Sequence, residues 1–144
     1  LANMPRSSKL PGIVMEDEQA LRTGHWTSST YGNPVDGTSV HDANAEKGKL
    51  SIEYSLTIPK SGRYEVRLSY VAAPNRASNV PVTITHKEGT ATVVVDEKKA
   101  PEIEGLFKSL GEFEFDQTKL AVITIRNEGT NGIVGADAVQ LLAH

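Results

Sequence analysis

A strict alternation of apolar and polar residues over residues 63–70 constrains the fold more than any other feature of the sequence. Successive side chains of a β-strand point to opposite faces of a sheet, so a period of two places apolar residues on one face and polar residues on the other. The run therefore predicts a half-buried antiparallel strand. Its apolar members are Tyr64, Val66, Leu68 and Tyr70, and its polar members are Arg63, Glu65, Arg67 and Ser69.

The same period recurs along the chain, most clearly over residues 50–58 and 80–85. Turn-forming residues such as those at 59–62 separate the runs, and no window of about ten residues repeats apolar side chains at helical spacing. We count about nine strands at intervals of roughly ten residues. The sequence therefore predicts an all-β fold, an antiparallel β-sandwich of the jelly-roll, galactose-binding-like kind.

Residues 1–11 contain proline, serine and lysine without periodicity, which predicts a linker or N-terminal arm in front of a single domain at residues 12–144. A chain of 144 residues is long enough to bury a core without disulfides, and this one contains no cysteine. It begins with leucine rather than methionine, which suggests a piece of a longer polypeptide.

The charge of the chain argues against two classes of partner. Its formal net charge is -3 at pH 7, so the composition gives no basic surface for nucleic acid or for an anionic membrane. No apolar run approaches the roughly 20 residues that a membrane-spanning helix needs. We therefore expect neither nucleic acid nor a membrane as a partner.

The loop at residues 72–79, between two predicted strands, carries the densest polar cluster. Asn75, Arg76 and Asn79 supply amide groups and a planar guanidinium, which are the groups that recognise vicinal hydroxyls or a uronate carboxylate. Loops held at both ends by a scaffold are common places for binding groups. The alternative is that the loop turns inward and that its asparagine side chains satisfy free backbone groups.

Two aromatic residues are candidates for stacking on a sugar ring. Trp26 is the single tryptophan, and Tyr31 borders an irregular loop at residues 32–44. Aromatic faces suit sugars because the axial C–H groups of a pyranose pack against a π surface. Trp26 is read equally well as a buried core residue. His41, beside Asp42 in the long loop, is either a further polar contact to the sugar or a tie between the loop and the sandwich.

Acidic residues near both ends of the predicted domain are candidates for holding a structural Ca²⁺. Glu16, Asp17 and Glu18 follow the first predicted strand, and Asp137 lies on the last one. Some lectin-like jelly rolls bind Ca²⁺ at such a place through carboxylates and backbone carbonyls. Glu16, Glu18 and Asp137 are therefore calcium candidates, and a solvated acidic edge is the alternative. We expect no other cofactor.

The sequence lacks the usual signatures of an active site. It contains no G-x-S-x-G elbow, no glycine-rich phosphate loop and no metal-ligand spacing among its four histidines. Glu112 and Glu114 lie two apart on a predicted strand and could in principle form an acid–base pair for glycoside cleavage, but charged strand faces are usually just solvated. We expect no catalysis by this domain itself.

Motifs spread over residues 12–142 carry a resemblance to a known family. They include Gly24-His25-Trp26-Thr27-Ser28-Ser29-Thr30, His41-Asp42-Ala43-Asn44, Gly62-Arg63-Tyr64-Glu65-Val66-Arg67, Asn75-Arg76-Ala77-Ser78-Asn79 and Ala136-Asp137-Ala138-Val139-Gln140. In these motifs the chain resembles the golvesin C-terminal-like domain family, also described as a xanthan-lyase carbohydrate-binding-like domain. The resemblance implies a module appended to bacterial polysaccharide lyases or other secreted or periplasmic proteins, often beside FAD-dependent oxidoreductase modules.

The resemblance and the loop chemistry lead to one expected function and one alternative. We expect a non-catalytic, carbohydrate-binding-like accessory module that holds a larger secreted bacterial enzyme near a polysaccharide or oligosaccharide. The two aromatic residues would stack on the sugar, while the polar candidates would bond to it. The alternative is a docking or spacer domain that packs on the catalytic domain of the same parent chain and binds no sugar. Both imply a secreted or periplasmic location.

Overall fold

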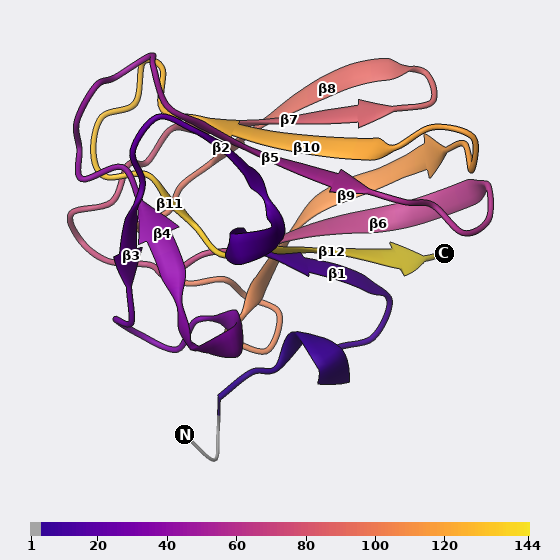
Figure 1. Cartoon of the computed structure of the whole chain (residues 1–144), viewed down its shortest axis with the longest axis horizontal. Coiled ribbons are helices and arrows are strands. Elements are labelled where there is room, and N and C mark those ends of the chain that lie inside the picture. The colour runs from indigo at the N-terminus through magenta and orange to yellow at the C-terminus, as the bar shows by residue number, and fades with distance from the viewer. Residues whose placement is uncertain (1–3) are drawn as a thin grey trace.

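The predicted strands pair into antiparallel sheets that form a sandwich (Figure 1). The computed structural model describes residues 4–144, and this part of the chain is divided into three sheets and three short 3₁₀ helices. The all-β sandwich prediction is confirmed. The helices, each of three residues, are η1 (Ser7–Lys9), η2 (Asp17–Gln19) and η3 (Val35–Gly37).

Two larger sheets make the layers of the sandwich, and a small third sheet lies at one end (Figure 1). The first has the order β1 (Ile13–Glu16), β12 (Ala138–Ala143), β6 (Gly62–Ser69) and β9 (Phe107–Phe115). The second has the order β2 (Leu21–Thr23), β5 (Ser51–Leu56), β10 (Ala121–Arg126), β7 (Val80–His86) and β8 (Gly89–Val95). The third has the order β11 (Gly135–Ala136), β4 (Ser39–His41) and β3 (Thr27–Ser29).

The predicted number of strands, about nine, is too low, because residues 4–144 form twelve. The additional strands are short ones: β2 and β4 have three residues each, and β11 has two. A period of two cannot be recognised in so few residues. These short strands nevertheless matter, since β4 and β11, together with β3, make up the whole of the third sheet.

The core lies between the two larger sheets and is filled by the apolar faces of their strands. On β5, Ile52, Tyr54 and Leu56 are buried and the residues between them are only half-buried, as the alternation predicts. Val66 and Leu68 of β6 are fully buried in the same core. Each such side chain stabilises the fold by about 1.5–3 kcal/mol relative to an exposed one.

The first and last strands of the domain are neighbours. β1 pairs antiparallel with β12, and this pairing places Ile13 opposite Leu141 and Glu16 opposite Ala138. β12 in turn pairs with β6, so it lies inside the first sheet. The first and last strands therefore lie side by side in the first sheet.

The described part of the predicted N-terminal arm lies against η3. The backbone N–H of Ser7 donates to the Asp36 carboxylate at 2.9 Å, and the Asp36 N–H donates to the carbonyl of Pro5 at 2.8 Å. Within residues 4–144, no helix has the length and apolar character needed to cross a membrane.

Candidate functional site

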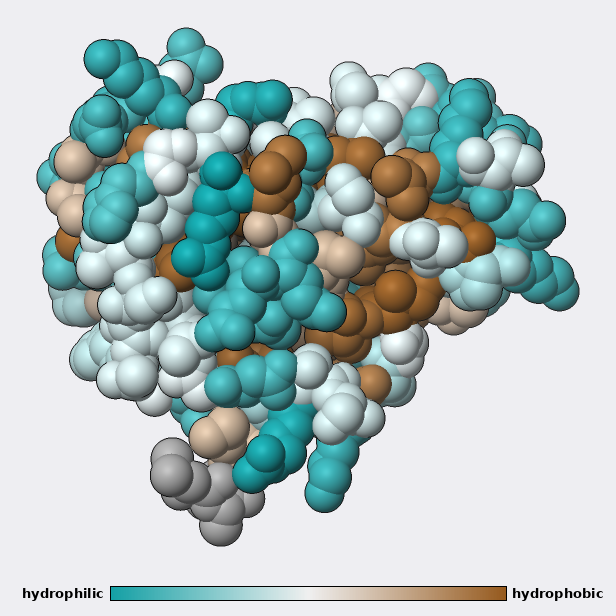
Figure 2. All heavy atoms as spheres, viewed as in Figure 1, coloured by the Kyte–Doolittle hydropathy of each residue, from teal (hydrophilic) through white to brown (hydrophobic). Residues whose placement is uncertain are grey.

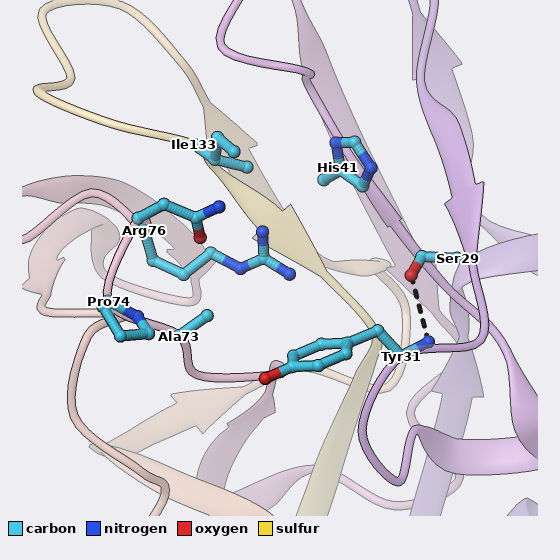
Figure 3. Close-up of a pocket in the computed structure, with 8 residues that line it drawn as sticks. Ser29, Tyr31, His41, Ala73, Pro74, Arg76 and Ile133 are labelled. Carbon is cyan, nitrogen blue, oxygen red and sulfur yellow. Dashed lines mark hydrogen bonds between the residues drawn. The ribbon is translucent and has the colours of Figure 1, made fainter.

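A pocket of about 540 Å³ opens beside the third sheet and brings together four of the predicted site residues (Figure 3). Strands β3 and β4 border it on one side, and the loop 73–76 borders it on the other. Its lining residues are Ser29, Tyr31, His41, Ala73, Pro74, Asn75, Arg76 and Ile133.

Backbone pairing between two distant segments fixes the loop side of the pocket. Arg76 forms a parallel bridge with Ile133, whose N–H donates to the carbonyl of Asn75 at 3.0 Å. The N–H of Ala77 donates to the carbonyl of Ile133 at 2.8 Å. Gly132 permits this approach, because a Cβ atom there would lie 2.8 Å from the carbonyl carbon of Arg76.

Arg76 is the central polar group of the pocket. Its side chain is only 7% exposed, and its Nε donates to the carbonyl of Val71 at 3.1 Å. Within residues 4–144 the guanidinium takes part in no ion pair. Figure 3 shows it extending into the space between Tyr31 and His41. A buried guanidinium with free terminal N–H groups is prepared to bind a planar anion.

His41 presents a donor to this pocket. Its Nδ1 accepts a hydrogen bond from the N–H of Ala43 at 3.0 Å, so in the neutral ring the proton lies on Nε2. Burial lowers the pKa of His41, the nearby charge of Arg76 lowers it further, and Asp42 acts in the opposite direction. The imidazole is therefore neutral at pH 7.

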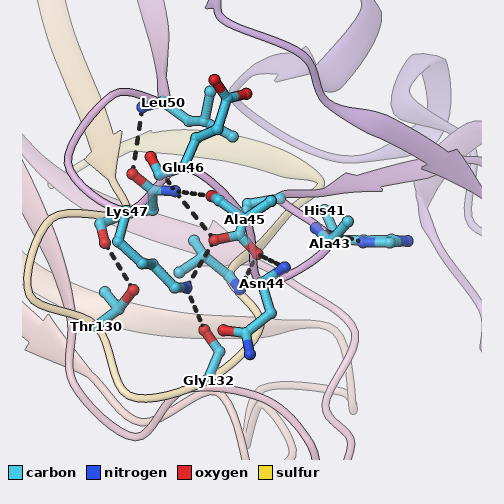
Figure 4. Close-up of polar contacts among 12 residues, drawn as sticks. His41, Ala43, Asn44, Ala45, Glu46, Lys47, Leu50, Thr130 and Gly132 are labelled. Carbon is cyan, nitrogen blue, oxygen red and sulfur yellow. Dashed lines mark hydrogen bonds and ion pairs between the residues drawn. The ribbon is translucent and has the colours of Figure 1, made fainter.

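Asp42 does not pair with His41 but ties the neighbouring loops together (Figure 4). Its Oδ1 accepts from the N–H groups of Asn44 and Val134, both at 2.9 Å. Its Oδ2 accepts from Lys47 Nζ at 2.8 Å and from Asn127 Nδ2 at 3.1 Å. Burial alone would raise the pKa of Asp42, but these bonds, led by that from Lys47, outweigh burial and lower it.

Trp26 is not a stacking surface, although the sequence made it a candidate for stacking on a sugar ring. It is 5% exposed and belongs to the core, and its Nε1 donates to the carbonyls of Thr23 and Ser51 at 3.2 and 3.1 Å. A sugar cannot reach a face that is packed against other side chains. The second interpretation, a core tryptophan, is the one the structure supports.

This burial predicts the fluorescence of the single tryptophan. We expect a blue-shifted emission that acrylamide quenches only weakly, and no change in the spectrum when a glycan binds in the pocket. An emission maximum typical of a water-exposed indole, or a saturable shift with a glycan, would contradict the burial of Trp26.

Asn79 also departs from its predicted binding role. Its Nδ2 donates to the carbonyl of Gly129 at 3.0 Å, and its Oδ1 accepts from the N–H of Asn131 at 2.9 Å. The side chain therefore satisfies backbone groups of a neighbouring turn, which is the alternative stated for this loop, and it does not line the pocket. Tyr31, by contrast, is 61% exposed at the rim.

The calcium candidates are near one another in the fold but have other partners. Glu16 caps η2 by accepting from the N–H of Glu18 at 3.1 Å, and Glu18 itself is exposed. Asp137 Oδ2 accepts from Val35 N–H and Ser69 Oγ, both at 2.9 Å. Among residues 4–144 no group of three or more His, Cys, Asp or Glu side chains could hold a metal ion. The calcium prediction gains no support from this geometry.

The carboxylates of β9 take part in surface ion pairs. Glu112 pairs with Arg63 at 3.0 Å and with His144 at 2.8 Å, and Glu114 lies 3.8 Å from Arg63. All four side chains are substantially exposed. This arrangement matches the interpretation of a solvated charged face.

The sequence profile of the golvesin C-terminal domain matches residues 13–143. The chain belongs to the golvesin C-terminal domain family. This confirms the resemblance found in the sequence motifs.

The golvesin domain is similar to a small part of two much longer lyases. It is 34% identical over 146 residues to a xanthan lyase from Bacillus sp. (strain GL1), a match that covers 96% of the domain and 15% of the lyase. The solved structure of a Paenibacillus xanthan lyase superposes with a TM-score of 0.80 at 34% identity, over 91% of the domain and 13% of that chain.

The golvesin domain also shares its fold with carbohydrate-binding modules. A family 35 carbohydrate binding module from Clostridium thermocellum matches with a TM-score of 0.63 at 10% identity, over 91% of the domain and 98% of the module. The Podospora anserina GH26-CBM35 β-(1,4)-mannanase matches with a TM-score of 0.67 at 17% identity, over 92% of the domain and 27% of that chain. At these identities the likeness establishes the sandwich fold.

Sequence reasoning missed Ser29 and Ile133 as pocket residues and Lys47 and Asn127 as the partners of Asp42. Ser29, Ile133 and Asn127 carry no short-range signal, because each acquires its role from a segment distant in the chain, whereas Lys47 lies only five residues from Asp42. The N–H groups of Gly48 and Leu50, for example, donate to Asn127 Oδ1 across 79 and 77 residues of sequence.

Proposed function

We propose that this golvesin domain is a non-catalytic carbohydrate-binding module of a larger polysaccharide-degrading enzyme, and that the pocket between β3, β4 and the loop 73–76 is its sugar site. The single observation that carries the proposal is a pocket that combines an exposed aromatic ring with a buried, unpaired guanidinium. The lyase relatives and the carbohydrate-binding modules of the same fold support it. An enzyme of this kind acts on polymers outside the cell, so we also propose a secreted or periplasmic location.

Four side chains have distinct roles in this proposal. The exposed ring of Tyr31 provides the stacking face, while the Nε2–H of His41 and the guanidinium of Arg76 donate to sugar oxygens. Asn75, which is exposed at the mouth of the pocket, offers an amide donor and acceptor. One stacking face and a few hydrogen bonds leave little free energy after the cost of ordering the sugar, so we expect weak affinity for a single chain end.

Titration calorimetry with Tyr31→Ala tests the site. We expect the mutation to weaken glycan binding by about three- to tenfold, because an aromatic packing contact contributes about 0.5–1.5 kcal/mol beyond buried area. Tyr31→Phe keeps the ring and should bind like the parent. The titrants are xanthan, mannan and β-1,3-galactan.

Leu120→Ala provides the matched control, because Leu120 is 54% exposed and lies outside the pocket. It should leave the affinity unchanged. If Tyr31→Ala bound the same glycan as tightly as the parent, the assignment of the stacking face would be wrong. If no polysaccharide or oligosaccharide bound at all, the proposed function would fail.

The docking alternative rests on a different surface. Figure 2 shows apolar side chains gathered over the part of the sandwich where β1, β12 and β5 lie. Ile13 and Met15 are only partly buried there, and Leu21 on the adjacent strand β2 is 66% exposed. If this surface packs on a catalytic domain, a chain that joins the two domains should be more stable than the isolated domains. In that case the golvesin domain should bind no sugar.

A further inference from the structure

The side chains around the pocket are unbalanced in charge. The lining contains a guanidinium, an imidazole, an amide and two hydroxyl groups, and none of the lining residues is acidic. The formal charge of the whole chain is nevertheless -3. The positive charge of the pocket therefore cannot follow from the charge of the whole domain and must come from the residues around it.

A buried carboxyl group lies directly behind the arginine. Glu97, which follows β8, is fully buried, and its Oε1 accepts from the N–H of Gly135 at 2.7 Å. Both side chains lie close to Gly135, because a Cβ atom there would be 3.6 Å from Glu97 Oε1 and 3.8 Å from Arg76 Nε. The second oxygen, Oε2, has no hydrogen-bond partner in the described part of the chain.

The guanidinium of Arg76 is always charged, and whether a nearby negative charge compensates it depends on the ionisation of Glu97. Burial raises the pKa of Glu97 to about 8; the bond from Gly135 and the charge of Arg76 lower it, and the charge of Asp42 raises it. Glu97 is therefore mostly protonated and neutral at pH 7.

The other charged groups nearby cancel one another. Asp42 is ionised but pairs with Lys47 at 2.8 Å, and His41 is neutral at pH 7. Arg76 is the remaining charge, and its terminal nitrogens face the pocket (Figure 3). The net charge offered to a ligand at neutral pH is thus positive.

We propose that the pocket selects a sugar that bears a carboxylate, which binds in the fork of the Arg76 guanidinium, and that Glu97, held by the N–H of Gly135 behind the arginine, tunes this selectivity. This inference rests on the proposed function and names its ligand class. Arg76 contacts the ligand, whereas Glu97 acts through Arg76 as a positioning residue. An ionised Glu97 would compete with the sugar carboxylate for the same guanidinium.

Matched acidic and neutral trisaccharides test the ligand class. The probes are trimers of galacturonate, glucuronate and mannuronate, each compared with the neutral trimer of the corresponding hexose, by calorimetry at pH 7 in 20 mM and 200 mM salt. We expect at least one acidic trimer to bind about tenfold or more tightly than its neutral partner, with the preference reduced at high salt. Arg76→Gln should abolish the preference.

The outcomes separate this inference from the proposed function. Equal binding of acidic and neutral trimers, or preference for the neutral ones, would overturn the acidic specificity and leave the sugar site standing. Binding of neither, here and in the polysaccharide titration, would overturn both. A preference for acidic trimers that persists in Arg76→Gln would show that a group other than Arg76 binds the carboxylate.

The pH dependence of binding tests the role of Glu97, and it is measured first in the unmodified domain. Between pH 7 and pH 9, ionisation of Glu97 should weaken binding of the acidic trimer by about three- to tenfold. Glu97→Gln retains the acceptor for Gly135 and should bind with no such decline, once circular dichroism has verified that it is folded. A flat profile in the unmodified domain, or an unchanged decline in Glu97→Gln, would exclude this role.

Discussion

Replacing Asp42 by alanine should lower the free energy of unfolding by about 3–5 kcal/mol, which is the largest effect we expect from a single substitution outside the apolar core. The carboxylate is buried and accepts four hydrogen bonds, from Asn44, Lys47, Asn127 and Val134. Alanine would leave the Lys47 ammonium and two backbone N–H groups without this acceptor. The loss should also loosen the pocket, since Asp42 follows His41 directly.

Chemical denaturation at several pH values measures this effect and its sign. Because the pKa of Asp42 is lowered in the folded domain, its contribution is present above the pKa of the unfolded chain, about 3.9, and is lost as the pH falls through the folded value. The difference between the parent and Asp42→Ala should therefore be full at pH 7 and shrink at low pH.

Asp116→Ala is the matched control for Asp42. Asp116 accepts from the N–H and Oγ1 of Thr118 at 2.9 and 2.8 Å, but it is only partly buried, at a turn. Its replacement should cost far less stability than that of Asp42. Equal losses for the two variants would mean that the buried position of Asp42 contributes nothing.

The second large effect has the opposite sign: Asp137→Asn should stabilise the domain at pH 8 by about 1–3 kcal/mol. Burial raises the pKa of Asp137 to about 7, against the bonds from Val35 and Ser69 that lower it. Asparagine keeps an oxygen for both donors and carries no charge. Part of the gain is lost, because the new amide NH₂ group would take the place of Oδ1, a buried atom that has no hydrogen-bond partner within residues 4–144.

The pH dependence again tests the cause. A group whose pKa is raised on folding stabilises fully below the unfolded pKa, and the contribution is lost as the pH rises through the folded value. The Asp137 contribution in the parent should therefore decline between about pH 4 and pH 7, and Asp137→Asn should remove this decline. Asp17, whose pKa burial also raises to about 7, adds a decline of the same sign that the variant retains.

Asp116→Asn is a control for which the change of stability with pH should have the opposite sign, since the bonds from Thr118 lower the pKa of Asp116. Each titration should be repeated with calcium and with EDTA. A rise in stability at pH 8 that depends on calcium would mean that Asp137 and its neighbours hold a metal, which is one of the two interpretations that the sequence left open. A parent whose stability does not change from pH 4 to pH 8 would contradict the raised pKa.

The long strands could be predicted from the sequence because each is a local pattern. Residues of β5 and β6 alternate over enough positions for the period of two to be visible, and one face of each is buried. The three-residue strand β4 shows no such pattern, and it exists because β3 and β11 pair with it from distant parts of the chain.

The site could be predicted only in part, for the same reason. Polar chemistry in two loops indicated Tyr31, His41, Asn75 and Arg76, which line one pocket. The burial of Trp26 depends on the carbonyl of Ser51, 25 residues away. Glu97 lies in the charged run Asp96-Glu97-Lys98-Lys99, which has the composition of a solvated turn, but it is buried, and bonds to Ala77 and Gly135 hold it from distant parts of the chain.

The pairing of β1 with β12 has a consequence for how the domain could be carried by a host protein. Ile13 lies opposite Leu141, so the first strand starts about 5 Å from a residue that is two positions before the end of the last strand. β3, β4 and β11 lie at the other end of the sandwich (Figure 1). If the arm bound to η3 were released, a host could therefore accept the domain within one surface loop without spreading the two ends of that loop. The domain would then stand out from its host with the pocket at the far tip, free to meet a polymer that the host itself does not touch.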